Sequence, residues 1–330
     1  MNIISICLST HRLETLPFSA RFMHVHDVIA LEEPAHPEFS HVLDGTTAID
    51  EHLPELDIEY PLFVRRQYRM LRSLHRSGKE ILQVEPYLDQ LLALQWFLAD
   101  GNTPQDLVPN TEQHAIYLAE RTATGRLIDY YRATRTADFN HILQTMNDFA
   151  KADAARFILR DTMRAKALAK LLQPGKKIYV EAGSIHLHLI RHLSRILPSS
   201  WQLRIYSIDR QILEKLGHHN GMLFSPGDQL TIAYLRAEQV AKERWQLFCA
   251  RAFIYAKLIG KEEELQSDSR YPHTQNEFDT IRLVNNLSLQ QCYDFFQDTR
   301  LLTADKAARL ILDRTSDHCS SLRVQAGRCS

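Results

Sequence analysis

The chain has 330 residues, of which 45% are hydrophobic and 24% are charged, and its formal net charge is −1. This composition is typical of a globular protein long enough for one large α/β domain or two smaller ones. The near-zero net charge gives no overall preference for nucleic acid or for an anionic membrane, so we expect neither as a partner.

The cysteines and the N-terminal residues indicate the cellular compartment. The 5 cysteines are scattered and never form a CxxC pair, which argues against a zinc ribbon or a disulfide framework and favours a reducing compartment. The opening "MNIISICLSTH" lacks the basic and long apolar regions of a signal peptide. No uncharged apolar run approaches the roughly 20 residues of a membrane span. We therefore expect a cytoplasmic protein.

Six short apolar segments rich in Ile, Val, Leu or Tyr are predicted to be β-strands. They cover residues 2–8, 27–32, 80–85, 177–182, 202–208 and 229–235. Helical patterns separate most of them. One is "PLFVRRQYRMLRSLHRSG", with Pro61 in its first turn and Gly78 at its end. Residues 111–172 are almost wholly helical in pattern, and amphipathic helices follow Leu235.

Alternating strands and helices predict an α/β fold, with a mainly parallel sheet covered by helices on both faces. The stretch at about 104–172 is too long for a simple crossover, so we interpret it as a helical insertion. The predicted organisation is an α/β core domain at 1–235 that contains this insertion. A helical C-terminal region at 236–330 is expected to pack on the core.

Acidic and imidazole side chains follow the predicted strands, where open α/β sheets bind their ligands. They are His11 after the first strand, Glu32 and Glu33 after the second, Glu85 after the third, Glu181 and His186 after the fourth, and Asp209 after the fifth. A solvated turn or a helix cap would explain any single one of these residues equally well. Their recurrence over consecutive strands favours a functional site.

The adjacent residues Glu32 and Glu33 should point to opposite faces of the sheet, so only one is expected to enter the site. We favour Glu33, which lies nearer the strand end. His186 would lie at the N-terminal tip of a helix that begins near Ser184, where the helix dipole disfavours an imidazolium. A neutral imidazole there suits a general base or a metal ligand, and a histidine bonded to nearby backbone is the alternative.

Arg156, Arg160 and Arg164 recur at i, i+4 spacing on the long helical pattern. Arg160 lies just before the turns that lead to the fourth strand, where it could hold a carboxylate or a substrate oxyanion. For the other two arginines, a surface helix paired through Asp153 and Asp161 is at least as good an interpretation.

Several familiar catalytic signatures are absent from the sequence. It contains no GxSxG, GxxxxGK[ST], GxGxxG or HExxH motif. Classical serine hydrolases, P-loop enzymes, dinucleotide enzymes and zincins are therefore disfavoured.

The stretch "ILRDTMRAKALAKLLQPGKKIYVEAGSIHLHLIRHL" resembles the late motif of the TraB/GumN proteins. In that family, an Arg-containing helix with a Met a few residues on leads to a strand and a Gly-x-x-His turn. Arg160, Met163, Gly183 and His186 occupy these positions here. The glutamate before the turn, Glu181, has no counterpart that can be carried over.

The segments "ICLSTHRLE" and "DVIALEEPAHPEF" resemble the opening of the wider superfamily, which includes the erythromycin esterase-like and ChaN-like proteins. There a histidine follows the first strand and a glutamate the second, which matches His11 and Glu33, with Glu32 as the alternative. Leu8 and Ser9 stand where the family usually has a glycine. The resemblance implies an α/β fold with its site at the strand ends. Members include metal-dependent proteases, ester-bond hydrolases and haem-binding proteins.

Our first hypothesis is a hydrolase acting on an ester or amide bond of a small molecule or peptide. His11, Glu33, Glu85 and His186 would activate water, either directly or through a divalent metal such as Zn, Mn or Fe, with His11, Glu33 and His186 as the metal ligands. Arg160 would stabilise the oxyanion. Glu181 would orient His186 or share its ligand.

Two alternatives remain open at this stage. One is a non-enzymatic protein that binds a small ligand or haem beside the same strand ends. The other is a degenerate interaction protein whose helical C-terminal third presents a partner or homodimer surface. All three hypotheses share one spatial expectation, that His11 and His186 follow neighbouring parallel strands.

Overall fold

The computed structural model describes residues 2–56, 58–219, 221–265, 267–303 and 305–315. The fold is α/β, built on a five-stranded sheet in which every pairing is parallel. The strands are β1 (Ile3–Ser9), β2 (Val28–Leu31), β3 (Glu80–Gln83), β4 (Lys177–Gly183) and β5 (Gln202–Ser207). Their order across the sheet is β3-β2-β4-β1-β5.

The carboxyl ends of all five strands lie at one edge of this parallel sheet. β1 pairs with β4 in a register that sets Ser9 opposite Gly183. His11 and His186 therefore follow neighbouring parallel strands, and this spatial prediction is confirmed. Five of the six predicted strands are present at nearly the predicted positions.

The helices of the chain occupy most of the remaining sequence. They are α1 (Leu16–His24), α2 (Phe39–Asp44), α3 (Ile49–His52), α4 (Pro61–Arg76), α5 (Pro86–Ala99), α6 (Glu112–Ala133), α7 (Phe139–Lys170), α8 (Leu187–Ile196), α9 (Ile208–Lys215), α10 (Pro226–Leu235), α11 (Lys242–Leu258), α12 (Pro272–Asn285) and α13 (Leu289–Thr299). Short 3-10 helices lie at Leu13–Thr15, Leu53–Glu55 and Pro104–Asp106.

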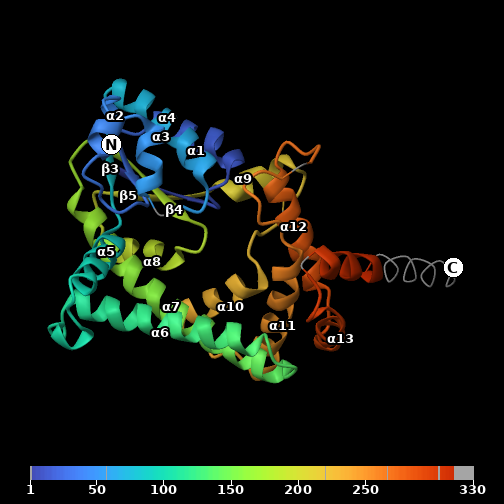
Figure 1. The fold of residues 1–330 in the computed structure, drawn as a ribbon. Coiled ribbons are helices and arrows are strands. Elements are labelled where there is room, and N and C mark those ends of the chain that lie inside the picture. The colour runs from blue at the N-terminus through green and yellow to red at the C-terminus, as the bar shows by residue number, and fades with distance from the viewer. Residues whose placement is uncertain (1, 57, 220, 266, 304, 316–330) are drawn as a thin grey trace. The chain divides into compact units, whose positions relative to one another are not determined.

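Both faces of the sheet are covered by helices, because alternate strand residues are apolar on each side. On one face, Ile29, Leu31 and Tyr179 pack in a cluster with residues of α1, α2, α4 and α9. On the other face, Ile178 and Val180 pack in a second cluster with residues of α7 and α8. Figure 1 shows α1 and α4 on one side of the sheet and α8 on the other.

The chain divides into two compact units. The first comprises Met1–Thr124, Ala152–Leu223 and Glu262–Gln275 and contains the whole sheet. The second comprises Gly125–Lys151, Phe224–Lys261 and Asn276–Ser330. Three of the boundaries fall inside α6, α7 and α12, and the other two fall between α9 and α10 and between α11 and α12, so none of them lies at residue 235.

The second unit is helical and has its own apolar core. Phe139 and Leu143 of α7, Phe253 of α11 and Phe296 of α13 belong to this core, together with Leu230 of α10. The last of these lies in the segment 229–235, which we predicted to be a strand, and that prediction was wrong. The Ser225 side chain accepts a hydrogen bond from the Asp228 amide in a capping box that starts the helix.

In the part of the chain that the structure describes, none of the helices is both long enough and apolar enough to cross a lipid bilayer.

Candidate functional site at the strand ends

The residues that follow the carboxyl ends of the five strands form what we call the strand-end rim. Its members, in the order of the sheet, are Glu85 after β3, Glu32 and Glu33 after β2, Glu181 and His186 at and after β4, His11 after β1, and Asp209 after β5. All belong to the first unit. The topology therefore brings every predicted rim residue to the same edge of the sheet.

The side chains of the two adjacent glutamates after β2 point to opposite faces of the sheet, as strand alternation predicts. Glu32 points toward α7, where its Oε1 lies 2.8 Å from Arg160 Nη2. Glu33 points toward α4, where its Oε2 accepts a hydrogen bond from the Tyr68 hydroxyl at 2.8 Å. It is Glu32, not the favoured Glu33, that contacts His186, with 2.7 Å between Glu32 Oε1 and His186 Nε2.

His186 lies between two carboxylates and is 2% exposed. Its Nε2 faces Glu32, and its Nδ1 is hydrogen-bonded to Asp161 of α7. Burial alone would lower the pKa of His186, but the facing charges of Glu32 and Asp161 outweigh it and raise the pKa to about 9. The neutral imidazole that we predicted is therefore wrong. α8 begins at Leu187, so His186 is its N-cap rather than a residue of its first turn.

This imidazolium and two arginines keep Glu32 ionised. Burial would raise the pKa of Glu32, but His186, Arg160 and Arg164 hold it well below its ordinary value. The Glu32 Oε2 atom also accepts a hydrogen bond from the Gly183 amide at 2.6 Å. Glu32 is thus a fixed anion at the centre of the rim.

Arg160 and Arg164 of α7 also hold Glu85, which is completely buried. Arg160 Nε lies 3.3 Å from Glu85 Oε1, and Arg164 Nε lies 3.4 Å from Glu85 Oε2. The surface interpretation is wrong for Arg164, which is fully buried and donates to the carbonyl oxygens of Val84 at 2.9 Å and Glu181 at 2.7 Å. Arg160 does hold carboxylates, as its position predicted.

Glu181 does not contact His186, contrary to the role that we expected for it. Its Oε1 accepts a hydrogen bond from Gln67 Nε2 at 2.5 Å, and its Oε2 accepts one from the Glu32 amide at 3.2 Å. The residue that orients His186 is Asp161, whose Oδ2 also accepts a hydrogen bond from the Leu189 amide at 2.8 Å. Glu181 lies on the α4 face of β4, where the His186 ring does not reach.

Glu33 is the rim carboxyl that is suited to exchange a proton near neutral pH. Burial raises the pKa of Glu33 to about 7. Hydrogen bonds from Gln83 and Tyr68 favour the ionised form, and the charge of Glu181 opposes it. Glu33 and Glu32 are both half-buried, whereas Glu85 is completely buried, so water and substrate can approach Glu33 more easily than Glu85.

His11 lies at the β1 end of the rim in a left-handed backbone conformation, with φ at 50°. Its ring packs against Phe63 with 5.7 Å between ring centroids. Its Nε2 is buried and has no hydrogen-bond partner among the described residues. Asp209 follows the next strand, where its Oδ1 accepts hydrogen bonds from Thr10 and its Oδ2 one from Ser184.

The structure does not bring the predicted metal ligands His11, Glu33 and His186 together. Among the described residues, the one group of at least three His, Cys, Asp or Glu ligand atoms lying mutually within 4.8 Å is His36, His52 and Glu55. His186 could not serve as a ligand without losing a carboxylate partner, since both of its nitrogens are engaged.

Sequence reasoning missed several residues that complete the rim. They are Gln67 and Tyr68 on α4, Gln83 at the end of β3, and Asp161 and Arg164 on α7. A usable signal existed for Asp161 and Arg164, which lie one and four residues after Arg160 in the motif that resembles the TraB/GumN proteins. Gln67 and Tyr68 lie on α4, for which the sequence predicted no contact with the rim.

Comparison with known proteins shows that the chain is similar to an archaeal protein. No family model matches the chain, and no solved structure matches it. A protein of Archaeoglobus fulgidus described as an uncharacterized protein is 31% identical over 292 residues, which cover 88% of this chain and 97% of the archaeal protein. The similarity therefore extends through both compact units.

Proposed function

The chain belongs to the same family as this Archaeoglobus fulgidus protein, and from its strand-end rim we propose that it is a hydrolase that cleaves an ester or amide bond. The observation that carries the proposal is the half-buried carboxyl of Glu33, whose burial raises its pKa to about 7. A general base works best when its pKa lies near the working pH.

In the proposed reaction, ionised Glu33 accepts a proton from the water that attacks the carbonyl carbon. The bond between that carbon and the leaving group then breaks, and Glu33 returns the proton to the leaving oxygen or nitrogen. Tyr68 and Gln83 donate to Glu33 Oε2 at 2.8 Å and 2.9 Å. These two bonds orient the carboxyl, so that Oε1 is the oxygen that faces the water.

Glu33 faces α4 and Arg160 comes from α7, so we propose that the substrate lies across the strand-end rim, where Arg160 stabilises the negative charge that develops on the carbonyl oxygen. The Arg160 guanidinium contacts Glu32 and Glu85 through Nε and Nη2. Its Nη1 is the nitrogen proposed to donate to the substrate. Its side chain is 19% exposed, whereas that of Arg164 is fully buried. Of the two arginines that contact Glu32 and Glu85, Arg160 is therefore the one that a substrate can reach.

The buried partners of Arg160 act as positioning residues in this proposal. Asp161 holds His186, His186 holds Glu32, and Glu32 holds the Arg160 guanidinium. A preorganised ion-pair chain of this kind needs no rearrangement during the reaction. Glu85 and Glu181 have the same supporting role, the first toward Arg160 and the second toward the Glu32 amide.

His11 is proposed to hydrogen-bond the bound substrate. A buried nitrogen without a partner is costly, and a substrate group at the β1 end of the rim would satisfy Nε2. We assign His11 no proton-transfer role, because its ring packs on Phe63 rather than beside Glu33.

The proposal is tested by turnover of a panel of activated esters and peptide anilides by the full chain, before and after Glu33→Gln. We expect the variant to lose about 10²- to 10⁴-fold in kcat/KM, the usual contribution of general acid–base catalysis. Glu80→Gln, at the exposed opposite end of β3, is the matched control and should retain full activity. Absence of turnover by the wild type, or full activity in Glu33→Gln, would refute the proposal.

A further inference from the structure

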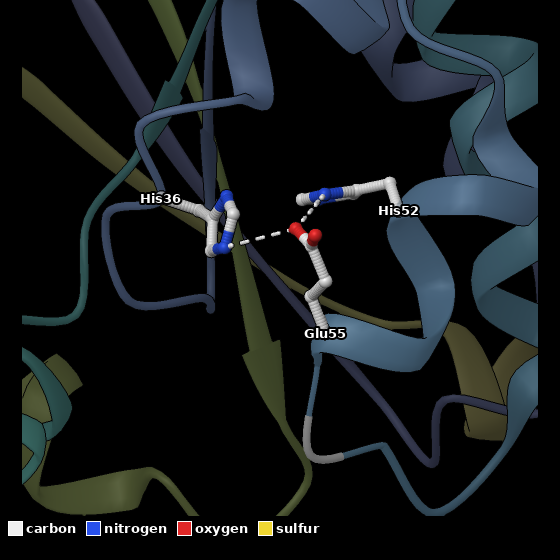
Figure 2. Close-up of side chains that lie close together, drawn as sticks. All are labelled: His36, His52 and Glu55. Carbon is white, nitrogen blue, oxygen red and sulfur yellow. Dashed lines mark ion pairs between the residues drawn. The ribbon is translucent and has the colours of Figure 1, made fainter.

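A second cluster of ligating side chains lies in the first unit, outside the residues to which we assigned the reaction. His36 follows β2, His52 is the last residue of α3, and Glu55 ends the 3-10 helix that comes next. Figure 2 shows both imidazoles converging on the Glu55 carboxylate. Each approaches the same oxygen, with 3.7 Å from His36 Nε2 to Glu55 Oε2 and 3.7 Å from His52 Nδ1 to Glu55 Oε2.

These separations are too long for hydrogen bonds, which place the two heavy atoms about 2.7–3.2 Å apart. They are close to the separation of two ligands on one metal ion. With metal–ligand bonds of about 2.0–2.1 Å, tetrahedral zinc holds its ligand atoms roughly 3.3 Å apart. Small side-chain rotations would therefore bring the three atoms to coordination distance.

His52 gives an independent reason to expect a ligand here. It is 1% exposed, and neither of its ring nitrogens has a hydrogen-bond partner among the described residues. Buried polar atoms in native proteins are nearly always paired, so two such atoms on one ring require an explanation. The ring stacks on Tyr68 and meets His36 edge-on, with centroids 5.8 Å and 4.6 Å away. Its Nδ1 points at Glu55.

The chemistry of the three side chains also suits a cation. Two imidazoles and one carboxylate offer two nitrogen ligands and one oxygen ligand. Nitrogen and carboxylate ligands in this ratio bind first-row divalent metals, and two histidines with one glutamate are a known zinc set.

Two neighbouring contacts fix His36 in place. Its backbone amide donates to Gln83 Oε1 at 2.8 Å, and its Nδ1 accepts from the Glu38 amide at 3.2 Å. Ligation through Nε2 places the imidazole proton on Nδ1, so the bond from Glu38 must open when a metal binds. We take this as the one local rearrangement that binding requires.

From this geometry we propose that His36, His52 and Glu55 form a binding site for a divalent transition metal, with zinc as the preferred ion. Three protein ligands leave a fourth position for water or for a ligand atom, the composition of an open rather than a closed structural zinc site. The proposal does not depend on the hydrolase function, which uses Glu33 and Arg160.

The test is zinc titration of the untagged full chain after treatment with a chelator, followed by calorimetry and elemental analysis. We expect one zinc per chain, and cobalt at the same site should give the intense visible absorption of tetrahedral coordination. His36→Ala and Glu55→Gln should each weaken zinc binding at least 10-fold. Loss of a residue that only supports a metal ligand already weakens binding by about 10- to 100-fold. These positions are preferred to the buried His52, since their side chains are 24% and 56% exposed and the variants should fold.

His41→Ala is the matched control, since its side chain is 58% exposed and contacts Glu38 rather than the cluster. It should bind zinc as the wild type does. Glu33→Gln should also keep its zinc, so the metal site and the hydrolase function can fail separately. Wild type that binds no zinc at one equivalent, or unchanged affinity in either ligand variant, would overturn the proposal.

Discussion

Replacement of His186 by glutamine should remove a large, pH-dependent contribution to stability. In the folded chain, Glu32 and Asp161 raise the pKa of His186 from 6.5 to about 9. Each pKa unit corresponds to about 1.4 kcal/mol, so the preference for the charged form is worth about 3 kcal/mol at this buried position. His186→Gln keeps a polar side chain of similar size but cannot carry the charge.

The sign of the pH dependence follows from the direction of the shift. The folded state binds the proton more tightly than the unfolded state, so the contribution is fully present below pH 6.5. It declines as the pH rises and is lost as the pH passes through about 9. Glu33 also has a raised pKa, but its effect is common to both proteins and cancels in their difference.

The assay is urea unfolding followed by far-UV circular dichroism at pH 5.5 and pH 9.5. The gap in unfolding free energy between wild type and His186→Gln should be about 3 kcal/mol larger at the lower pH. His24→Gln replaces an exposed imidazole at the end of α1 and is the matched control, whose gap should stay below about 0.5 kcal/mol at both pH values. If the gap for His186→Gln is also independent of pH, His186 is not held as a cation and the proposed ion-pair chain is wrong.

Three further substitutions test separate parts of the structure. Arg164→Met should lower the unfolding free energy by about 3–5 kcal/mol, because it removes a buried partner of the Glu85 carboxylate and of the Glu181 carbonyl oxygen. A loss under about 1 kcal/mol in urea unfolding would contradict this. Tyr68→Phe removes a hydrogen bond that favours ionised Glu33, so it should raise the pKa of Glu33. The acid limb of the pH–rate profile should therefore move to higher pH, and a limb that stays in place would contradict this. Ser225→Ala should cost about 0.5–2 kcal/mol, measured by thermal unfolding, and no loss would mean that the α10 capping box is dispensable.

The sheet could be predicted from the sequence because its strands are short, apolar and well separated. The same reasoning failed for α10, whose residues "QLTIAYL" are as apolar as those of a buried strand. The deciding signal lay outside that run, in Ser225, Pro226 and Asp228, which form the capping box that starts a helix. Periodicity within a short apolar run cannot separate a buried strand from a buried helix.

The rim could be located from the sequence, but its contacts could not be assigned. Strand ends place His11, Glu32 and His186 at one edge, since parallel strands all end there. The charge of His186 depends on Asp161, which lies 25 residues away in the chain and meets it only through the packing of α7. Helix-dipole reasoning treated the histidine alone, and two facing carboxylates outweigh that effect.

The most direct test of the account is a carbon-13 titration of the glutamate side-chain carboxyls by NMR, comparing wild type with Glu33→Gln. Burial raises the pKa of Glu33 to about 7, and that value is what qualifies this residue as the general base. We predict one glutamate resonance that titrates near pH 7 and is missing from the variant spectrum. A wild-type spectrum in which every glutamate carboxyl titrates below about pH 5, near the ordinary range, would contradict the account.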